Sequence, residues 1–194
     1  MQVNMSFLPD GASGEWKVET FEVPKKSFSE AVSMFKYGRG VPPGTYKRLV
    51  RGGQIVMSNT PDEIRDFAPF IRKAKGSILI NGLGLGCVVK VLLEKPEITK
   101  ITVIEKSSDV ITLVLPHFND ERLVVINADA FKFKPSKTDK FDAVWHDIWD
   151  NICSDNLKEM STLHRKYACK AEWQDSWAKA ECQRQARHDR MYSY

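Results

Sequence analysis

Residues 77–87 read Ser77-Ile78-Leu79-Ile80-Asn81-Gly82-Leu83-Gly84-Leu85-Gly86-Cys87, an apolar run that breaks into alternating glycines. The chain then continues as Val88-Val89-Lys90-Val91-Leu92-Leu93-Glu94, so the pattern predicts a strand, a tight turn and a helix. Glycines at 82, 84 and 86 lack the β-carbons that would keep a ligand away from the backbone, and the helix directs unpaired N–H groups at the turn. We therefore expect a nucleotide-shaped site, with a purely structural turn as the alternative.

The composition is that of a globular protein. The chain has 194 residues, of which 42% are hydrophobic and 28% charged, enough for one domain with a core and some additions. The formal net charge of +4 is mild, and basic residues are interleaved with acidic ones, which argues against a dedicated nucleic-acid surface and leaves a local one as an alternative. No apolar stretch reaches membrane-spanning length and the first residues lack a signal pattern, so we expect a cytoplasmic protein without a membrane partner.

The cysteines and histidines indicate neither disulfides nor a metal. No CxxC pair occurs among Cys87, Cys153, Cys169 and Cys182. Widely spaced cysteines predict reduced thiols and no zinc site. The histidines, at positions 117, 146, 164 and 188, are too scattered to suggest ligation, so no metal is expected.

The first part of the chain predicts a strand, a short helix, a hairpin and a longer helix. Alternating bulky and polar residues predict a strand at 16–23, and helical spacing predicts a helix at 27–37. Two short segments at 46–50 and 54–58 flank Arg51-Gly52-Gly53, which is a hairpin signal. Thr60 and Glu63 match a capping box, so a helix is expected from there to about residue 74, kinked or divided at Pro69.

From Ser77 onward the pattern alternates between strands and helices. Strands are expected at 77–81, 100–105, 122–127 and 141–147, with helices in the first two intervals. Such alternation predicts a parallel sheet with right-handed crossovers, and ligands bind outside the carboxyl ends of its strands. The fold class expected is therefore α/β, a Rossmann-like doubly wound parallel sheet with an N-terminal β-hairpin extension and a helical C-terminal tail.

The segment after Asp150 shows only helical spacing, through Leu157, Met160, Leu163 and Tyr167 and then through Trp173 and Trp177. We divide the chain accordingly into an N-terminal extension at 1–75, a nucleoside-binding core at 76–151 and C-terminal helices at 152–194. The fourth strand would then be a sheet edge that the C-terminal helices, the N-terminal hairpin or a second copy must cover. A homodimer is one expectation from this pattern.

Carboxylates follow the second and third strands of the core. Glu105 lies 19 residues after Gly86, a separation at which a strand-end acid can accept hydrogen bonds from both ribose hydroxyls of a nucleoside. Asp129 can accept from the exocyclic amine of an adenine, and Ala130 leaves room for the ring. The alternative for each acid is a solvated surface charge. The dinucleotide fingerprint would need glycine where this chain has Cys87, so adenosine with a short cationic tail fits better than NAD.

The fourth strand ends in Trp145-His146-Asp147-Ile148-Trp149-Asp150. Asp147 and Asp150 could bind a cationic substrate, or one could act as a general base if burial or the other carboxylate raises its pKa. The alternative is a turn with solvated aspartates. No Ser-His-Asp arrangement points to hydrolysis.

These segments resemble the class I S-adenosylmethionine-dependent methyltransferase fold, and within it the spermidine synthase-like branch. The resemblance covers about residues 49–151 and rests on five segments in matching order: Arg51–Ser58 with Asp62-Glu63, Ile78–Cys87, Val103–Ile111, Arg122–Ala130 and Asp142–Asp150. It implies S-adenosylmethionine as cofactor. It also implies that Gln54, Glu105 and Asp129 contact the adenosyl ligand and that Asp147 occupies the catalytic acid position.

The sequence departs from spermidine synthases at two places. The polyamine-binding Tyr-His-Glu of that branch is Asp66-Phe67-Ala68 here, and the acid inside its glycine loop is Leu85. A full methyltransferase fold also continues with three more strands after the fourth, where this chain shows helical patterns. We therefore expect a transferase, a methyltransferase in the first place, on an unidentified small or macromolecular acceptor. Aminopropyl transfer and a binding module without catalysis are the alternatives.

Overall fold

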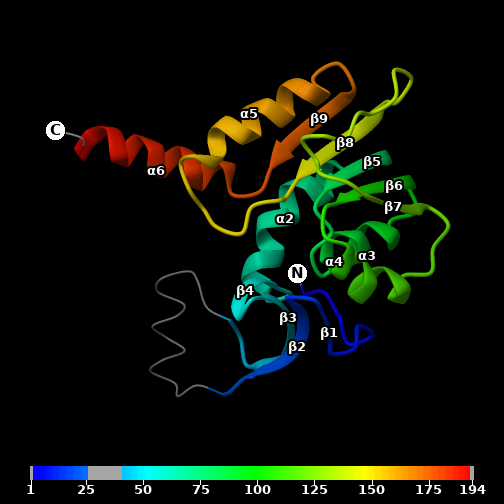
Figure 1. Ribbon diagram of the computed structural model, residues 1–194, viewed down its shortest axis with the longest axis vertical. Coiled ribbons are helices and arrows are strands. Elements are labelled where there is room, and N and C mark those ends of the chain that lie inside the picture. Colours follow the sequence, from blue (N-terminus) through cyan, green and yellow to red (C-terminus); the bar gives the residue numbers. More distant parts are fainter. Residues whose placement is uncertain (1, 26–40, 193–194) are drawn as a thin grey trace.

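The chain forms two sheets, which the computed structural model describes for residues 2–25 and 41–192. The first sheet is antiparallel with strand order β1-β2-β3-β4, formed by β1 (Gly11–Ser13), β2 (Trp16–Val23), β3 (Gly44–Arg51) and β4 (Gln54–Ser58). The second is parallel with order β7-β6-β5-β8-β9, formed by β7 (Leu123–Asn127), β6 (Ile98–Glu105), β5 (Gly76–Asn81), β8 (Phe141–His146) and β9 (Ala171–Ser176). In Figure 1 the antiparallel sheet lies below the parallel one, and helix α2 leads from one to the other.

Helices cover both faces of the parallel sheet. They are α2 (Pro61–Lys73), α3 (Cys87–Leu93) and α4 (Ser108–Val114), followed by the 3-10 turn η1 (Leu115–His117), on one face and α5 (Asn156–Tyr167) on the other. Helix α6 (Lys179–Tyr192) contacts α5 and extends away from the sheet (Figure 1). Successive strand residues point to opposite faces, so Ile78 and Ile80 pack with α2, α3 and α4, whereas Leu79 packs with Tyr167 of α5. The expected Rossmann-like α/β architecture is confirmed: the sheet is parallel and covered on both sides.

The fifth strand, β9, corrects the expectation that only helices follow Asp150. It pairs in parallel with β8, from Phe141 opposite Ala171 to His146 opposite Ser176. Trp173 therefore belongs to a strand, and its ring stacks on Phe70 of α2 at a centroid distance of 6.0 Å. The prediction that β8 is a sheet edge is wrong for the same reason, because β9 covers it. The argument for a dimer from an uncovered fourth strand no longer applies, although a homodimer itself stays a prediction, as do the three segment boundaries.

The N-terminal expectations need smaller corrections. Helix α2 starts after Thr60 as expected, but the Thr60 side chain makes no capping hydrogen bond. Instead, the Glu63 carboxylate accepts from the backbone N–H and the hydroxyl of Ser58, both at 2.6 Å. Helix α2 is not divided at Pro69. The helix predicted at 27–37 lies outside the described residues. Among the helices that the structure describes, none is long and apolar enough to cross a membrane.

Candidate active site

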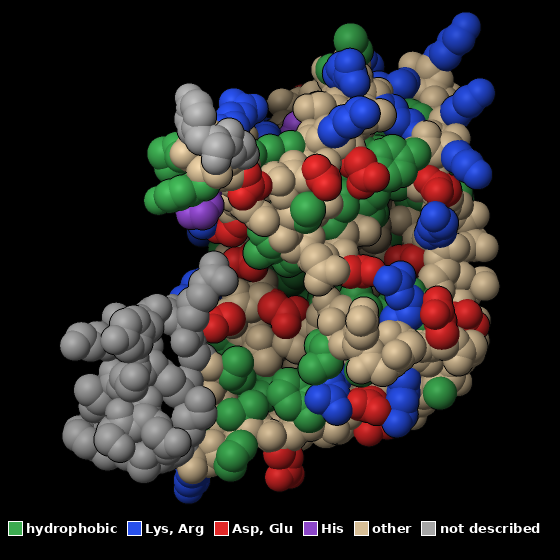
Figure 2. Space-filling model, turned by 60° about the vertical axis from the view of Figure 1, so that its left-hand side comes forward, with side chains coloured by type: hydrophobic (Ala, Val, Ile, Leu, Met, Phe, Trp, Pro, Cys, Tyr) green, Lys and Arg blue, Asp and Glu red, His purple; other side chains and the backbone are tan. Residues whose placement is uncertain are grey.

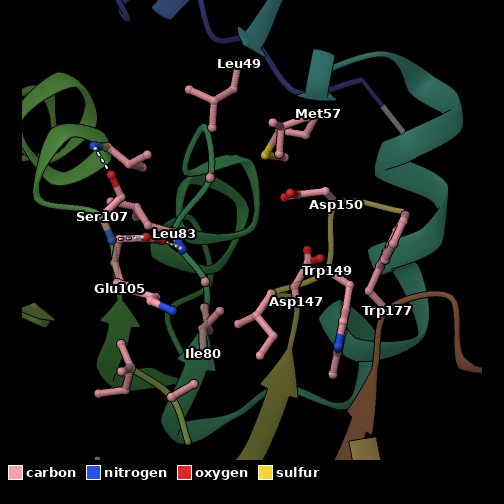
Figure 3. A pocket seen from close by; sticks show the side chains of 18 of the residues that line it. Leu49, Met57, Ile80, Leu83, Glu105, Ser107, Asp147, Trp149, Asp150 and Trp177 are labelled. Carbon is pink, nitrogen blue, oxygen red and sulfur yellow. Dashed lines mark hydrogen bonds between the residues drawn. The ribbon is translucent and has the colours of Figure 1, made fainter. Parts of the chain in front are cut away.

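A pocket of about 550 Å³ lies at the carboxyl ends of β5, β6 and β8, bounded on its other side by the antiparallel sheet and α2. This volume is typical of a small-molecule site. Figure 2 shows acidic side chains gathered around a hollow in this face of the molecule. Figure 3 shows Glu105 and Ser107 on one side of the pocket and Asp147, Trp149, Asp150 and Trp177 on the other, with Met57 and Leu49 above.

The glycine turn forms the floor between these sides. Gly82 and Gly84 line the pocket and both have positive φ, 101° and 53°, a region that glycine adopts without a steric cost. A β-carbon on Gly82 would lie 1.9 Å from the backbone oxygen of Asp147, so the ends of β5 and β8 touch here. A β-carbon on Gly84 would instead meet the sulfur of Met57 at 2.2 Å. That sulfur accepts the backbone N–H of Leu85 at 3.1 Å, so Met57 lies directly over the turn.

Glu105 ends β6 and lines the pocket, although only 9% of its surface is exposed. Its carboxylate accepts two backbone hydrogen bonds, from the N–H of Leu83 at 2.8 Å and from the N–H of Ser107 at 2.7 Å (Figure 3). Each oxygen keeps a second lone pair, so the carboxylate can accept two further donors. These two bonds fix Glu105 against the glycine turn and the start of α4.

Asp129 and Ala130 follow β7 at the same edge of the sheet, and both line the pocket. One Asp129 oxygen accepts the N–H of Phe131 at 2.8 Å, and the other pairs with Lys106 at 3.2 Å. Partial burial of the carboxyl acts to raise its pKa, but these two partners outweigh burial and hold the pKa below its usual value. Ala130 is small and buried, so a flat group can lie against it next to the ionised Asp129 carboxylate.

Asp147 immediately follows β8 and lies in the wall of the pocket. Desolvation in this wall raises the pKa of its carboxyl to about 7, and the negative charges of Glu63 and Asp66 act in the same direction. The indole of Trp145 opposes the shift, but its Nε1 is too poorly placed to make a regular hydrogen bond. Asp147 is therefore poised to exchange a proton near neutral pH.

Asp150 and the tryptophans form the outer wall. Asp150 makes an ion pair with Arg51 of β3, and the guanidinium of Arg51 lies over the ring of Trp16 at 5.2 Å from its centroid. The Nε1–H of Trp149 donates to Glu159 of α5 at 2.7 Å. These contacts connect the antiparallel sheet and α5 to the segment after β8, so three separate parts of the chain close one side of the pocket.

Two predicted contact residues are not brought to the pocket. Gln54 begins β4 next to the tip of the hairpin, where its side chain is exposed, and it does not line the pocket. Gly86 faces the interior instead, and a β-carbon there would lie 2.6 Å from the ring of Phe118. The remaining seven predicted site residues line one pocket: Gly82, Gly84, Glu105, Asp129, Ala130, Asp147 and Asp150.

Several lining residues had no assigned role from the sequence. Arg51 and Met57 lie in the predicted hairpin and Trp16 in the predicted first strand, but no local pattern shows that these strands fold over the glycine turn. Trp149 lies in the motif that contains Asp147, and two such tryptophans beside two acids were a usable signal. Trp177 follows β9, so it could be placed only once that strand was known.

The lining is strongly acidic. The described residues that line the pocket include eight acids but only two basic residues, Arg51 and Lys106; the acids are Glu15, Glu63, Glu105, Asp109, Asp129, Asp147, Asp150 and Glu159. No group of three or more His, Cys, Asp or Glu side chains in the described part of the chain is arranged to hold a metal ion. Cys87 also lines the pocket, but burial raises the pKa of its thiol, which therefore stays protonated and unreactive.

Comparisons with known proteins identify the fold. No protein family and no curated protein matches the sequence. Among solved structures, spermidine synthase from Thermotoga maritima matches with a TM-score of 0.50 and 15% identity, over 84% of this chain and 52% of that one. This chain has the class I methyltransferase fold. The N-methyltransferase NodS from Bradyrhizobium japonicum, solved with S-adenosyl-L-homocysteine, matches over 65% of this chain and 67% of its own, with 16% identity and a TM-score of 0.47.

The class I methyltransferase fold was expected from the sequence, and that expectation is confirmed. The chain spans about half the length of the matched spermidine synthase. Its parallel sheet has the order β7-β6-β5-β8-β9, so it extends one strand beyond the expected four. In this fold the pocket lies at the carboxyl ends of the central strands, where ligands of open α/β sheets bind.

Proposed function

We propose that this protein is an S-adenosylmethionine-dependent methyltransferase. The observation that supports this most is that four consecutive strands of the parallel sheet deliver a glycine turn, Glu105, Asp129 with Ala130, and Asp147 to one pocket. This order along the chain is the one expected for a nucleoside site followed by a proton-accepting group. The class I methyltransferase fold agrees with this assignment.

The residues present fit the adenosyl part of the cofactor. Glu105 has free lone pairs on a carboxylate that is already fixed by two backbone N–H groups, so it would hold the ribose hydroxyls. Asp129 would accept a hydrogen bond from the exocyclic amine of the adenine, and the small, buried Ala130 would leave space for the adenine ring. Gly82 and Gly84 let the turn pack closely against Asp147 and Met57, and the methionine part would lie beside this turn. When bound, S-adenosylmethionine supplies a methyl group on a positively charged sulfur.

We assign to Asp147 the roles of positioning the methyl acceptor and taking up its proton. Methyl transfer from sulfur needs mainly alignment of the nucleophile, so holding the acceptor in place can supply most of the rate. A protonated acceptor must also lose a proton, and a carboxyl with a pKa of about 7 can take it at neutral pH. Both roles require only that the acceptor lie against the wall that contains Asp147.

The charge of the pocket supports a positively charged acceptor. The eight lining acids are opposed by two basic residues, and both of these are already paired, Arg51 with Asp150 and Lys106 with Asp129. Trp149 and Trp177 add aromatic faces, which attract cations. An amine on a small molecule or on a macromolecule satisfies both features, whereas a phosphate or carboxylate acceptor would be repelled.

Aminopropyl transfer is the second candidate, because the same acidic wall would suit a diamine. Leu85, however, is fully buried in the main core, and buried Phe67 presents a ring to the pocket. Neither position offers a polar group. Incubation with decarboxylated S-adenosylmethionine and putrescine distinguishes the two reactions, since the second candidate requires that spermidine be formed.

Titration calorimetry with S-adenosylmethionine and S-adenosylhomocysteine tests the proposal. We expect both to bind, and Glu105→Gln to weaken binding about 10- to 100-fold, because a charged acceptor of hydrogen bonds is lost. Glu121→Gln, on the exposed turn before β7, is the matched control and should bind as the parent does. NAD should not bind. Absence of binding by both adenosyl ligands would contradict the proposal. Binding without methyl transfer to any of a panel of amines would leave a module without catalysis.

A further inference from the structure

The last residues of three neighbouring strands are polar and lie side by side. They are Asn81 of β5, His146 of β8 and Ser176 of β9, and the sheet register places Asn81 opposite His146 and His146 opposite Ser176. All three are buried, and Asn81 and His146 have no exposed surface. Buried polar side chains are costly unless they are hydrogen-bonded, so such a row in a parallel sheet calls for a reason.

Hydrogen bonds connect this row to a second layer. The Asn81 amide lies 2.7 Å from Nδ1 of His146, and Nε2 of His146 lies 3.3 Å from the Gln174 carbonyl oxygen. Gln174 donates to the backbone oxygen of His164 in α5 at 2.9 Å, and Nε2 of His164 lies 2.8 Å from the Ser176 hydroxyl. The links therefore run from β5 through β8 and β9 to α5 and back to β9. We call Asn81, His146, Ser176, Gln174 and His164 the polar row.

The arrangement requires a neutral His146. The amide N–H of Asn81 donates to Nδ1, so the ring proton sits on Nε2 and points at Gln174. The ionisable groups that act on His146 from the packed elements are His164 and Lys166 of α5 and Lys179 of α6, and all three disfavour a second proton. The Asn81 oxygen has no regular hydrogen-bond partner among the described residues, nor has the Tyr167 hydroxyl that approaches Asn81. Only the neutral imidazole can both accept the hydrogen bond from Asn81 and donate one to Gln174.

Each strand-end member of the polar row is followed directly by a residue of the pocket. Gly82, Asp147 and Trp177 come next in the three strands, and all line the site. Their backbone N–H groups are held by the strand ends as well: Gly82 donates to Ile104 at 2.8 Å, Asp147 to Asn81 at 2.8 Å and Trp177 to His146 at 2.9 Å. A shift of one strand end against another would therefore move the groups that face the ligand.

We propose that the polar row is the positioning element of the site: hydrogen bonds through the neutral His146 imidazole hold the ends of β5, β8 and β9 in register, and so place Gly82, Asp147 and Trp177 around the ligand. The inference rests on the proposed function only for the identity of that ligand. None of these five side chains is needed to touch it. Strand β9 would therefore help to position the pocket residues as well as extend the sheet.

Amide hydrogen exchange of the ligand-free protein is the direct test. His146→Leu keeps a side chain of suitable size but breaks both bonds, and we expect exchange at Gly82, Asp147 and Trp177 to become about 10- to 100-fold faster. Amides at the middle of the same strands, Ile78 and Ala143, should keep their rates. His146→Gln can still accept and donate, so it should recover part of the protection. Equal acceleration at all five amides, or none at the three strand ends, would overturn the proposal.

Two controls separate positioning from plain loss of a buried hydrogen bond. Tyr46→Phe removes a buried hydroxyl that donates to Pro42 at 2.9 Å in the antiparallel sheet, and it should leave the three strand-end amides unchanged. Gln174→Leu removes the links of Gln174 to His146 and His164 but leaves the Asn81–His146 bond, so it should reproduce the His146→Leu pattern more weakly, even if His146→Leu folds poorly. S-adenosylhomocysteine affinity, measured in the same variants, should fall with the loss of protection. If the parent does not bind this ligand, the proposed function fails, while the exchange rates still decide the positioning element.

Discussion

Arg51 and Asp150 form an ion pair that joins the antiparallel sheet to the segment after β8 across the outer side of the pocket. Both side chains are more than one third exposed, so solvent screens the pair and its share of stability is small. We expect Arg51→Met to change the free energy of unfolding by less than about 1 kcal/mol. Because the pair connects two walls, its loss should accelerate dissociation of S-adenosylhomocysteine severalfold, as stopped-flow measurements would show.

Arg48 offers a matched control for that experiment. It lies on the same strand, pairs with Glu19 and places its guanidinium over the ring of Phe21, but it does not line the pocket. Arg48→Met should therefore leave ligand dissociation unchanged. If both variants release the ligand at the same rate, the Arg51–Asp150 pair does not restrain the pocket.

The pH dependence of methyl transfer should depend on Asp147. The pKa of this carboxyl is raised to about 7 by burial and by the negative charges of Glu63 and Asp66, and only the ionised form can take a proton. We expect kcat/KM to rise with pH, with a midpoint near the pKa. Asp147→Asn should lose about 10²- to 10⁴-fold in kcat and should also lose this rising limb. Asp150→Asn is the comparison, and a rising limb with the same midpoint in Asp147→Asn would rule Asp147 out as the base.

Stability should respond to pH through two neighbouring groups of opposite sign. Burial lowers the pKa of His146 from 6.5 to about 3, so the unfolded state gains a proton first and stability falls as the pH drops through this window. The pKa of Asp147 is raised from 3.8 to about 7, so the folded state keeps its proton longer and stability falls as the pH rises through that window. Between about pH 4 and pH 6.5 the two contributions oppose each other.

Replacing either Asp147 or His146 should reveal the pH dependence that the other residue contributes to stability. In Asp147→Asn the free energy of unfolding should increase by about 2 kcal/mol from about pH 5 to pH 6.5, since only the His146 contribution remains at this pair. In His146→Gln the Asp147 contribution should make it decrease over the same interval. Glu63, whose pKa burial raises, and His164, whose pKa burial lowers, act in opposite directions and are present in both variants. Urea unfolding at several pH values measures both slopes. Slopes of the same sign would show that one of the two assignments is wrong.

The two pocket glycines should differ in their tolerance of alanine. Both have positive φ, which costs any other residue about 1 kcal/mol. At Gly82 the new methyl group would also collide with the backbone oxygen of Asp147, which cannot move without opening the sheet, so we expect a loss above about 3 kcal/mol. At Gly84 it would meet only the flexible Met57 side chain, and the loss should stay near about 1 to 2 kcal/mol. Equal losses in urea unfolding would contradict this difference.

Much of the core could be predicted from the sequence, because parallel strands buried on both faces appear as apolar runs such as Ile78–Ile80. Once the strands are taken as parallel, their carboxyl ends share one edge, so Glu105, Asp129 and Asp147 had to lie close together. Their identities as ligand contacts stay predictions. The agreement comes from topology, which fixes where a strand-end residue lies but says less about which way a hairpin residue faces.

What the sequence did not indicate has physical causes. Strand β9 lies at the edge of the sheet and contains one large apolar residue, Trp173, among polar ones, so it lacks the apolar run of a central strand. The four-residue spacing between Trp173 and Trp177 also matches that of an α-helix. Gln54 matches a motif of the spermidine synthase-like branch, but its place near the hairpin tip leaves its side chain in solvent. Arg51 reaches a partner 99 positions away, and no local pattern encodes such a contact.

The lining of the pocket runs from Glu15 to Trp177, so it is assembled from nearly the whole described length of the chain. During synthesis the glycine turn and Glu105 emerge long before Trp177 does. Under the proposed function the adenosyl contacts come from the ends of β5, β6 and β7, whereas the wall that contains Trp177 forms only once β9 has paired with β8. A ligand that contacts both groups of residues would then stabilise the completely folded chain against global unfolding by mass action.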